Sequence, residues 1–195
     1  MQILRQINKK FQRSIIKHFK ITTMERLDIP DDSWSNKAKE SNALLENFAL
    51  LNNWEKHELV KQTGDIRTYG RCGNEKIFYG ALFYSIHEQK AKGSITYGPW
   101  SSNGTNYVHG GAIATHHDSI AGILVNKLFG PCVTAYLNIN YKSPMSVGST
   151  FLYECDVKKV EGRKIFVENK IFSFEHEQVV GDASALFVLL KKDLL

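Results

Sequence analysis

Apolar residues in this 195-residue chain recur at helical spacing in some stretches and alternate at strand spacing in others. The longest helical stretch covers residues 109–129, HGGAIATHHDSIAGILVNKLF, and leaves no wide polar face. A helix that is apolar nearly all round is normally buried in a core. Asp118 lies in its middle, where a carboxylate is costly unless it is hydrogen-bonded, paired or open to a cleft. The pattern therefore predicts a buried central helix that carries a functional Asp.

Strand patterns flank this helix on both sides. Two such stretches precede the helix and four follow it: 77–86, 93–97, 132–141, 151–160, 164–174 and 179–190. Within 132–141, Thr134 and Asn140 share a parity with Lys142, so simple alternation predicts that these three side chains line one face. One long helix followed by an antiparallel meander that can wrap it indicates an α+β fold.

The stretch upstream of the strands has a helical pattern. Residues 28–62 combine a capping-type start at Asp31, Asp32 and Ser33 with apolar residues at helical spacing. They predict one or two helices that pack on the domain, followed by a turn-rich connection at 64–74. We therefore expect a leader at 1–25, a helical N-terminal extension at 26–75 and the main domain at 76–192.

The net charge of +5 comes from the N-terminus. Residues 1–20 hold six Lys or Arg and no acid, with apolar residues near helical spacing, whereas the rest of the chain holds 19 basic and 20 acidic residues. A basic, amphipathic, acid-free leader is typical of mitochondrial presequences. We expect it to target the protein to the mitochondrial matrix; the alternative is a cytoplasmic protein with a basic surface helix or tail. The balanced remainder gives no indication of nucleic-acid binding.

The cysteines and the hydropathy narrow the class of protein. Cys72, Cys132 and Cys155 are odd in number and lack metal-ligand spacing, so we interpret them as reduced thiols in an intracellular protein and expect no metal and no cofactor. No run of residues approaches the ~20 apolar positions of a transmembrane helix. The sequence therefore predicts neither a metal site nor a transmembrane segment.

The start of the central helix is a candidate donor site. Gly110 and Gly111 let a ligand approach the backbone, and the first N–H groups of a helix lack internal partners and carry the positive end of its dipole. His109 precedes Asp118 by nine residues, which is roughly 13 Å along a helix. One helix therefore cannot bring its own Gly pair and its own Asp to one small group. If both act in one site, two antiparallel copies must meet in a symmetric dimer.

The residues HGGAIATHHD resemble the H-G-G-A-x-A-T-x-x-D signature of hotdog-fold acyl-CoA thioesterases. The segments LNINYKSP and VEGRK are similar to the following strand and turn of thioesterase superfamily members four and five. The resemblance covers about residues 76–190 well, and the extension and leader more loosely. It implies a hotdog fold, in which an antiparallel sheet wraps one long central helix, and a homodimer that often assembles further into a homotetramer.

The resemblance also implies roles for individual residues. Asp118 falls on the catalytic base or nucleophile, Thr134 on the hydroxyl that orients the attacking water, and Gly110 on the amide that polarises the thioester carbonyl. The residues that hold substrate or CoA fall on Asn140, Lys142, Arg163 and Lys164. We expect His109 to donate a hydrogen bond that fixes the loop at the substrate. His116 and His117 depart from the branch, which usually has apolar residues there, and we interpret them as polar packing.

The favoured function is hydrolysis of medium- to long-chain fatty acyl-CoA to free fatty acid and CoA. Two alternatives stay open. A hotdog dehydratase or hydratase keeps a His five residues after the helix Asp, where this chain has Ile123. A non-catalytic acyl-CoA-binding or signalling partner is also compatible with the fold, because fold does not fix function. Arg163 and Lys164 suit the phosphates of CoA, but they are equally compatible with an ordinary solvated hairpin.

Overall fold

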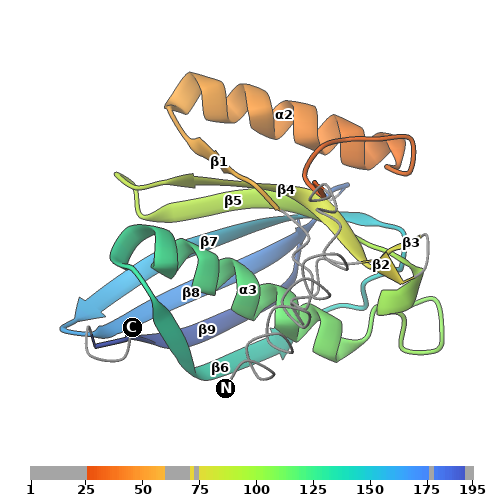
Figure 1. Cartoon of the computed structure of the whole chain (residues 1–195). Coiled ribbons are helices and arrows are strands. Elements are labelled where there is room, and N and C mark those ends of the chain that lie inside the picture. The colour runs from red at the N-terminus through yellow and green to blue at the C-terminus, as the bar shows by residue number, and fades with distance from the viewer. Residues whose placement is uncertain (1–25, 60–70, 73–74, 176–177, 192–195) are drawn as a thin grey trace, which may run out of the picture.

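The structure is a computed structural model that describes residues 26–59, 71–72, 75–175 and 178–191. A seven-stranded antiparallel sheet with the order β1-β4-β5-β7-β8-β9-β6 curves around one long helix, α3 (Gly110–Phe129) (Figure 1). Its strands are β1 (Glu55–His57), β4 (Phe78–Ser85), β5 (Lys90–Tyr97), β6 (Cys132–Tyr141), β7 (Thr150–Glu161), β8 (Lys164–Ser173) and β9 (Val179–Leu189). The other elements are α2 (Asn36–Asn52), the 3-10 helix η1 (Pro99–Ser101), and a small ribbon of β2 (Arg71–Cys72) and β3 (Glu75–Lys76). This arrangement confirms the predicted α+β hotdog fold.

The sheet covers only one face of α3. Residues at helical spacing, among them Ile113, Ile120 and Leu124, are buried against the sheet in the main core. The opposite stripe, which includes Thr115, Asp118 and Gly122, is only half-buried. The helix is therefore buried as predicted on one side, while the side that carries Asp118 stays accessible in the single chain.

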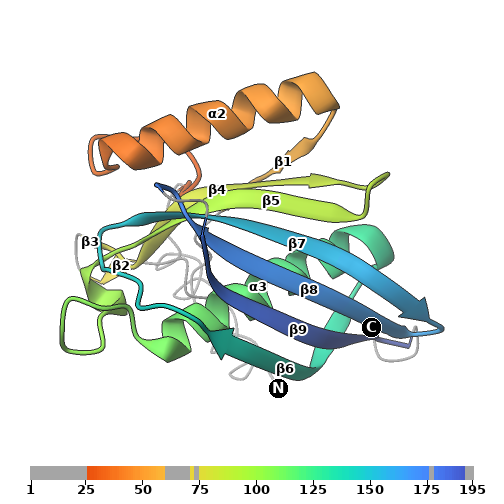
Figure 2. The same cartoon turned by 180° about the vertical axis from the view of Figure 1, so that it is seen from behind.

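The second helix, α2, packs on the outer face of the sheet, the face away from α3. Along β4, Phe78 and Leu82 point into the main core, while Ala81 and Phe83 lie in a separate cluster with Ala49 of α2. Figure 2 shows α2 over the β4 end of the sheet, with the outer face of β8 and β9 left uncovered by the two described α-helices. Both faces of β4 are thus covered, which is why the whole strand is buried.

The N-terminal extension differs from its prediction in two respects. The N-cap of α2 is Ser35, whose hydroxyl accepts from the Ala38 amide at 3.2 Å, while Asp31 accepts from the Ser33 amide in the preceding turn. The extension is also not wholly helical, because β1 pairs with β4 at the edge of the main sheet. Neither the expected leader at 1–25 nor most of the connection at 64–74 lies within the described residues.

Five strands agree closely with the predicted ranges, and β5 is longer than predicted. It begins at Lys90 rather than at residue 93 because Lys90 and Lys92 lie on the outer face, opposite Asp156 and Glu154 of β7, while Ala91 between them is buried. A strand with one solvent-facing side commonly alternates polar and buried residues in this way. The turn between β7 and β8 contains Gly162 with φ 58°, a left-handed conformation that favours Gly.

A β-bulge in β6 overturns the predicted sharing of one face by Thr134, Asn140 and Lys142. The register with β9 shifts between Thr134 and Tyr136, which leaves the residue between them outside the pairing. Thr134 is opposite the buried Phe187 and faces α3, whereas Asn140 is opposite Asp182 and faces away from α3. The prediction was wrong because one extra residue reverses the alternation.

In the described part of the chain, no helix is both long and apolar enough to cross a membrane.

Candidate active site

Asp118 and Thr134 meet at the open side of α3. Asp118 lies midway along the helix. Thr134 lies in β6 just before the bulge, and its side chain faces Asp118. The Thr134 hydroxyl donates to Asp118 Oδ1 at 2.7 Å. Asp118 is half-buried and Thr134 is exposed. The buried helix therefore carries its carboxylate in the one arrangement that costs little, hydrogen-bonded and open to a cleft.

The cleft beside this pair is a pocket of about 440 Å³. Its lining includes residues that the sequence did not single out: His57, Ser119, Gly122, Asn126, Lys127, Cys132 and Phe187. Gly122 and Asn126 follow Asp118 at intervals of four, so helical periodicity alone could have found them. His57 comes from β1, and no local pattern indicates that pairing. Ile123 also lines the pocket, at the position where a hydratase would need a histidine.

The Cys132 thiol lies close to Asp118 but is not poised to react. Burial raises the pKa of Cys132, and the negative charge of Asp118 raises it further. Its Sγ lies 3.9 Å from the Gly122 carbonyl. Because the thiolate is the nucleophilic form, a raised pKa disfavours Cys132 as a nucleophile and leaves Asp118 and Thr134 as the candidate pair of the pocket.

The start of α3 presents a free backbone donor. Nδ1 of His109 accepts from the Gly111 amide at 2.9 Å, and the His109 carbonyl accepts from the amides of Ala112 and Ile113. Among the described residues, no group accepts from the Gly110 amide. His109 fixes the loop as predicted, but as an acceptor rather than as the expected donor. His109 accepts from the amides of Gly111, Ala112 and Ile113, and the Gly110 N–H therefore remains available at the positive end of the helix.

Gly110 is held in place by Tyr141, which the sequence did not single out. The Tyr141 hydroxyl donates to the Gly110 carbonyl at 3.1 Å, and a Cβ on Gly110 would sit 3.6 Å from the Tyr141 ring. Gly110 and Asp118 are eight residues apart, about 12 Å along the helix axis. The pocket beside Asp118 does not include Gly110 among its lining residues. Within one chain the two candidate groups therefore belong to separate places.

The predicted substrate-binding residues divide between the two ends of the sheet. Asn140 and Lys142 flank Tyr141 at the Gly110 end but face away from α3, where Asn140 donates to Asp182 at 2.7 Å and Lys142 forms an ion pair with Asp182. These contacts, with Lys142 the larger contributor, lower the pKa of Asp182.

Arg163 and Lys164 lie at the other end of the sheet, in the β7–β8 hairpin. Ile165 is opposite Phe187, which in turn is opposite Thr134, so the hairpin and the Asp118 pocket share one end of the sheet. Arg163 Nη1 donates to the Leu189 carbonyl at 3.0 Å, and both basic side chains are exposed. The hydrogen bond anchors the hairpin, while the charges remain accessible.

His116 and His117 are packed in the core rather than in the Asp118 pocket. Burial lowers the pKa of both; for His117 it is lowered to about 4, although the charge of Asp182 partly opposes the shift. The His116 ring lies edge-on to Tyr153 with centroids 4.9 Å apart, and Asn169 donates to the His117 carbonyl at 2.8 Å. Both imidazoles are therefore neutral packing groups at neutral pH, in line with the polar packing expected from the sequence.

Comparison with known proteins agrees with this geometry. The sequence model of the Thioesterase superfamily matches residues 105–180. The mouse acyl-coenzyme A thioesterase THEM4 is 32% identical over 165 residues, which are 82% of this chain and 71% of the mouse protein. The Xenopus laevis THEM4 is 34% identical over 113 residues, 58% of this chain, and the match spans about half (51%) of the frog protein.

A solved structure shows the same fold. A Streptococcus mutans protein bound to acetyl CoA superposes with a TM-score of 0.54 at 20% identity, covering 68% of this chain and 98% of that protein. At this identity the likeness concerns the fold alone, which is that of the sheet and α3 described above.

Proposed function

The chain belongs to the thioesterase superfamily, with THEM4 and THEM5 acyl-CoA thioesterases among its relatives, and on that premise we propose that it hydrolyses fatty acyl-CoA to a free fatty acid and CoA. The observation that carries the proposal is the Asp118–Thr134 hydrogen bond at the mouth of a pocket. Ile123, Val133 and Phe187 give that pocket apolar walls, which favours acyl groups of medium to long chain.

The proposed chemistry needs one base and one oxyanion donor. Asp118 takes a proton from a water that Thr134 helps to orient, and the water oxygen attacks the thioester carbonyl carbon. The carbonyl oxygen becomes an oxyanion, which accepts a hydrogen bond from a Gly110 amide at the positive end of α3. Collapse of the tetrahedral intermediate breaks the C–S bond, and the proton held by Asp118 returns to the CoA thiolate. The products are a fatty acid and CoA.

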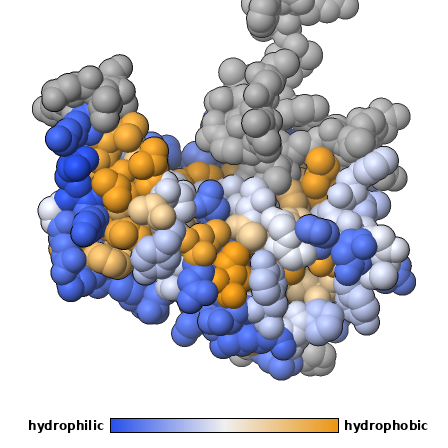
Figure 3. Space-filling model, turned by 90° about the horizontal axis from the view of Figure 1, so that it is seen from below, coloured by the Kyte–Doolittle hydropathy of each residue, from blue (hydrophilic) through white to orange (hydrophobic). Residues whose placement is uncertain are grey.

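The separation of Gly110 from Asp118 requires a second chain. We propose a homodimer in which two α3 helices run antiparallel, so that Asp118 of each protomer meets the Gly110 amide of its partner. Two features of the single chain support it: the half-buried second stripe of α3, and β6, whose outer edge pairs with no other strand among the described residues. Figure 3 views the protein from the β6 side and shows hydrophobic patches between hydrophilic residues. Unpaired edge strands are ready partners for another chain.

The exposed cations at the Asp118 end suit the phosphates of CoA. Arg163 and Lys164 lie on the hairpin nearest the pocket, and Lys127 lies on its wall. Asn140 and Lys142 contact Asp182 on the face of β6 away from α3, so the proposal gives them no contact with the thioester. It assigns the CoA phosphates to Arg163, Lys164 and Lys127.

A pair of complementary variants tests the proposal. Asp118→Asn keeps the shape of the side chain and removes the base, so kcat should fall roughly 10²–10⁴-fold. Gly110→Pro removes the amide hydrogen by closing a ring on the nitrogen, and the backbone accepts it, because Gly110 is the first residue of α3, where proline is well tolerated, and His109 already has φ −64° and ψ 135°. The matched control Gly110→Ala keeps the amide and meets only an ordinary contact with Tyr141.

Mixing the two inactive chains distinguishes a shared site from a self-contained one. A heterodimer of Asp118→Asn and Gly110→Pro has one intact site, so an equal mixture should regain about a quarter of the wild-type activity. Gly110→Ala should stay active by itself. If heterodimers form and the mixture stays inactive, each chain contains its own whole site; if Asp118→Asn alone keeps full activity, Asp118 is not the base.

A further inference from the structure

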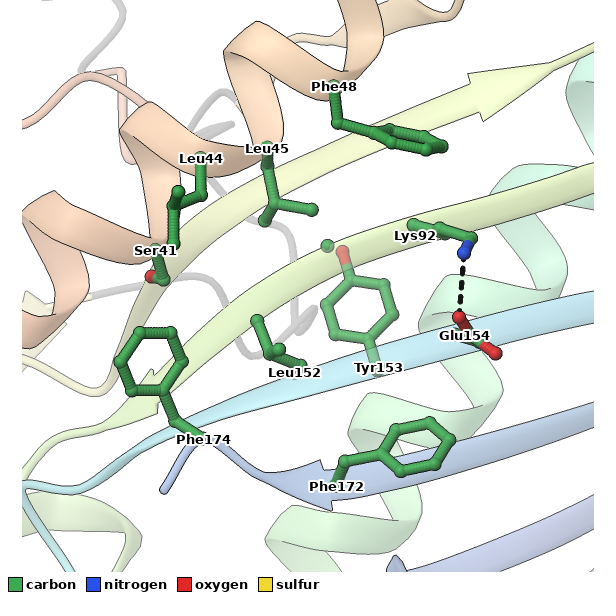
Figure 4. Close-up of a pocket in the computed structure, with 11 residues that line it drawn as sticks. Ser41, Leu44, Leu45, Phe48, Lys92, Leu152, Tyr153, Glu154, Phe172 and Phe174 are labelled. Atoms are coloured by element: carbon green, nitrogen blue, oxygen red, sulfur yellow. Dashed lines mark ion pairs between the residues drawn. The ribbon is translucent and has the colours of Figure 1, made fainter. Parts of the chain in front are cut away.

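A groove of about 450 Å³ lies on the outer face of the sheet, the face opposite the Asp118 pocket. α2 supplies Leu44, Leu45 and Phe48 to one wall, and the strands supply Leu152 of β7 and Phe172 of β8 to the other. Figure 4 shows these side chains facing one another between the helix and the sheet, with Phe174 at one end. The volume and the apolar, aromatic lining are typical of small-molecule sites, which measure ~300–1,000 Å³.

The other end of the groove is charged. Lys92 and Glu154 form an ion pair of 2.7 Å there (Figure 4), and Lys92 Nζ lies 5.2 Å from the centre of the Phe48 ring. Glu154 is also directly opposite Lys170 on β8. Lys170 lies outside the groove and is in turn opposite Asp182 on β9, so Lys92 is the cation among the lining residues and Glu154 its carboxylate partner. Because Glu154 has a second ammonium group beside it, Lys92 can exchange its partner for the anionic head of a ligand.

The apolar surface lies inside the groove rather than around it. Among the described residues, Leu44 is the one exposed large hydrophobic side chain that lines the groove, and Leu51 lies further along the same stripe of α2. A partner protein would need a broad apolar rim to dock on, whereas a slender ligand needs only the walls. Concave apolar walls with a cation at one end match an alkyl chain that ends in a carboxylate.

We propose that this groove binds a free fatty acid, with its alkyl chain between α2 and the β7–β8 surface and its carboxylate beside Lys92. The site is separate from the Asp118 pocket, since the two lie on opposite faces of the sheet. Binding here does not depend on whether the chain hydrolyses thioesters. If it does, the groove holds the class of molecule that the reaction releases.

The first test varies the chain length of the fatty acid and the charge at the end of the groove. Binding is measured by calorimetry on the full-length protein with excess CoA present. The affinity should rise roughly fourfold for each methylene from octanoate to laurate, because each buried methylene contributes a constant increment. Lys92→Gln should weaken laurate binding several-fold, and the matched variant Lys90→Gln, on the same strand and face but outside the groove, should not.

The second test locates the bound fatty acid. A diazirine derivative of palmitate is cross-linked to the protein, and the labelled peptides are mapped. We expect adducts within residues 36–52 or 150–174. Leu44→Glu should abolish them and Leu50→Glu should leave them, because Leu44 and Leu50 are 58% and 79% exposed on the same helix but only Leu44 lines the groove. Both positions are exposed enough for the fold to tolerate the change.

Three results would overturn the proposal. The first is adducts confined to residues 110–134, which would assign the fatty acid to the Asp118 pocket alone. The second is equal labelling of Leu44→Glu and Leu50→Glu. The third is a change in the sedimentation of the unliganded Leu44→Glu protein with no change in labelling, which would show that a second copy of the chain covers the groove. The hydrolytic activity of wild type is measured in parallel and decides the proposed function separately.

Discussion

The two buried histidines of α3 should make the free energy of unfolding fall as the pH falls. His117 is 1% exposed and has a pKa of about 4 in the fold, against an ordinary value of 6.5. As the pH falls, the unfolded chain binds the proton first, so the stability that neutral His117 provides is present above about pH 6.5 and is lost between there and about pH 4. His116 is shifted in the same direction by burial and by His117.

The magnitude follows from the two pKa values of His117. Between pH 7 and pH 5 the unfolded chain takes up most of one proton at this residue while the folded chain takes up almost none. Integrating that difference gives a loss of about 2 kcal/mol in the free energy of unfolding from His117 alone. The carboxylates whose pKa values are lowered, Asp182 and Glu161, titrate below this range, so they contribute little to the change.

Urea unfolding at pH 7 and pH 5 measures this loss, with the fluorescence of the buried Trp34 and Trp54 as the signal and the protein concentration held fixed. His117→Gln should be less stable at pH 7, yet its loss between pH 7 and pH 5 should be smaller than that of wild type by about 2 kcal/mol. His87→Gln, in the exposed β4–β5 turn, is the matched control and should behave as wild type. If His117→Gln and wild type lose equal stability, His117 is protonated as easily in the fold as in the unfolded chain and the reasoning is wrong.

Two further predictions concern the hairpin and the leader. Replacing both Arg163 and Lys164 by Ala should raise KM for acyl-CoA with little change in kcat, the signature of uniform binding. The double variant of Lys158→Ala and Lys159→Ala on β7 serves as the control. An unchanged KM would leave Arg163 with only its structural contact to the Leu189 carbonyl. Residues 1–30 fused to a fluorescent protein should direct it to mitochondria, because six basic and no acidic residues occupy positions 1–20; a reporter that stays in the cytosol would refute the leader.

The sequence by itself determined the features that depend on neighbours along the chain. Helical spacing and the Gly residues at both ends predict α3 almost to the residue, because capping and periodicity are local. Alternation and turn residues likewise predict β6 to β9 to within a residue or two. Asp118 stood out because a carboxylate in an apolar helix needs a physical reason, and the Gly110–Asp118 separation follows from helix rise alone.

Tertiary structure decided what depends on partners distant in sequence. The bulge in β6 places Thr134 against Asp118 and turns Asn140 to the outer face, because register is set by pairing with β9 and not by alternation within one strand. β1 joins the sheet and brings His57 to the pocket through a pairing with β4 that has no local signature. The low pKa of His117 and the groove under α2 arise from packing of the sheet against each helix. Periodicity indicates which side of a helix is apolar, but only the assembled layers decide how much of that side is covered.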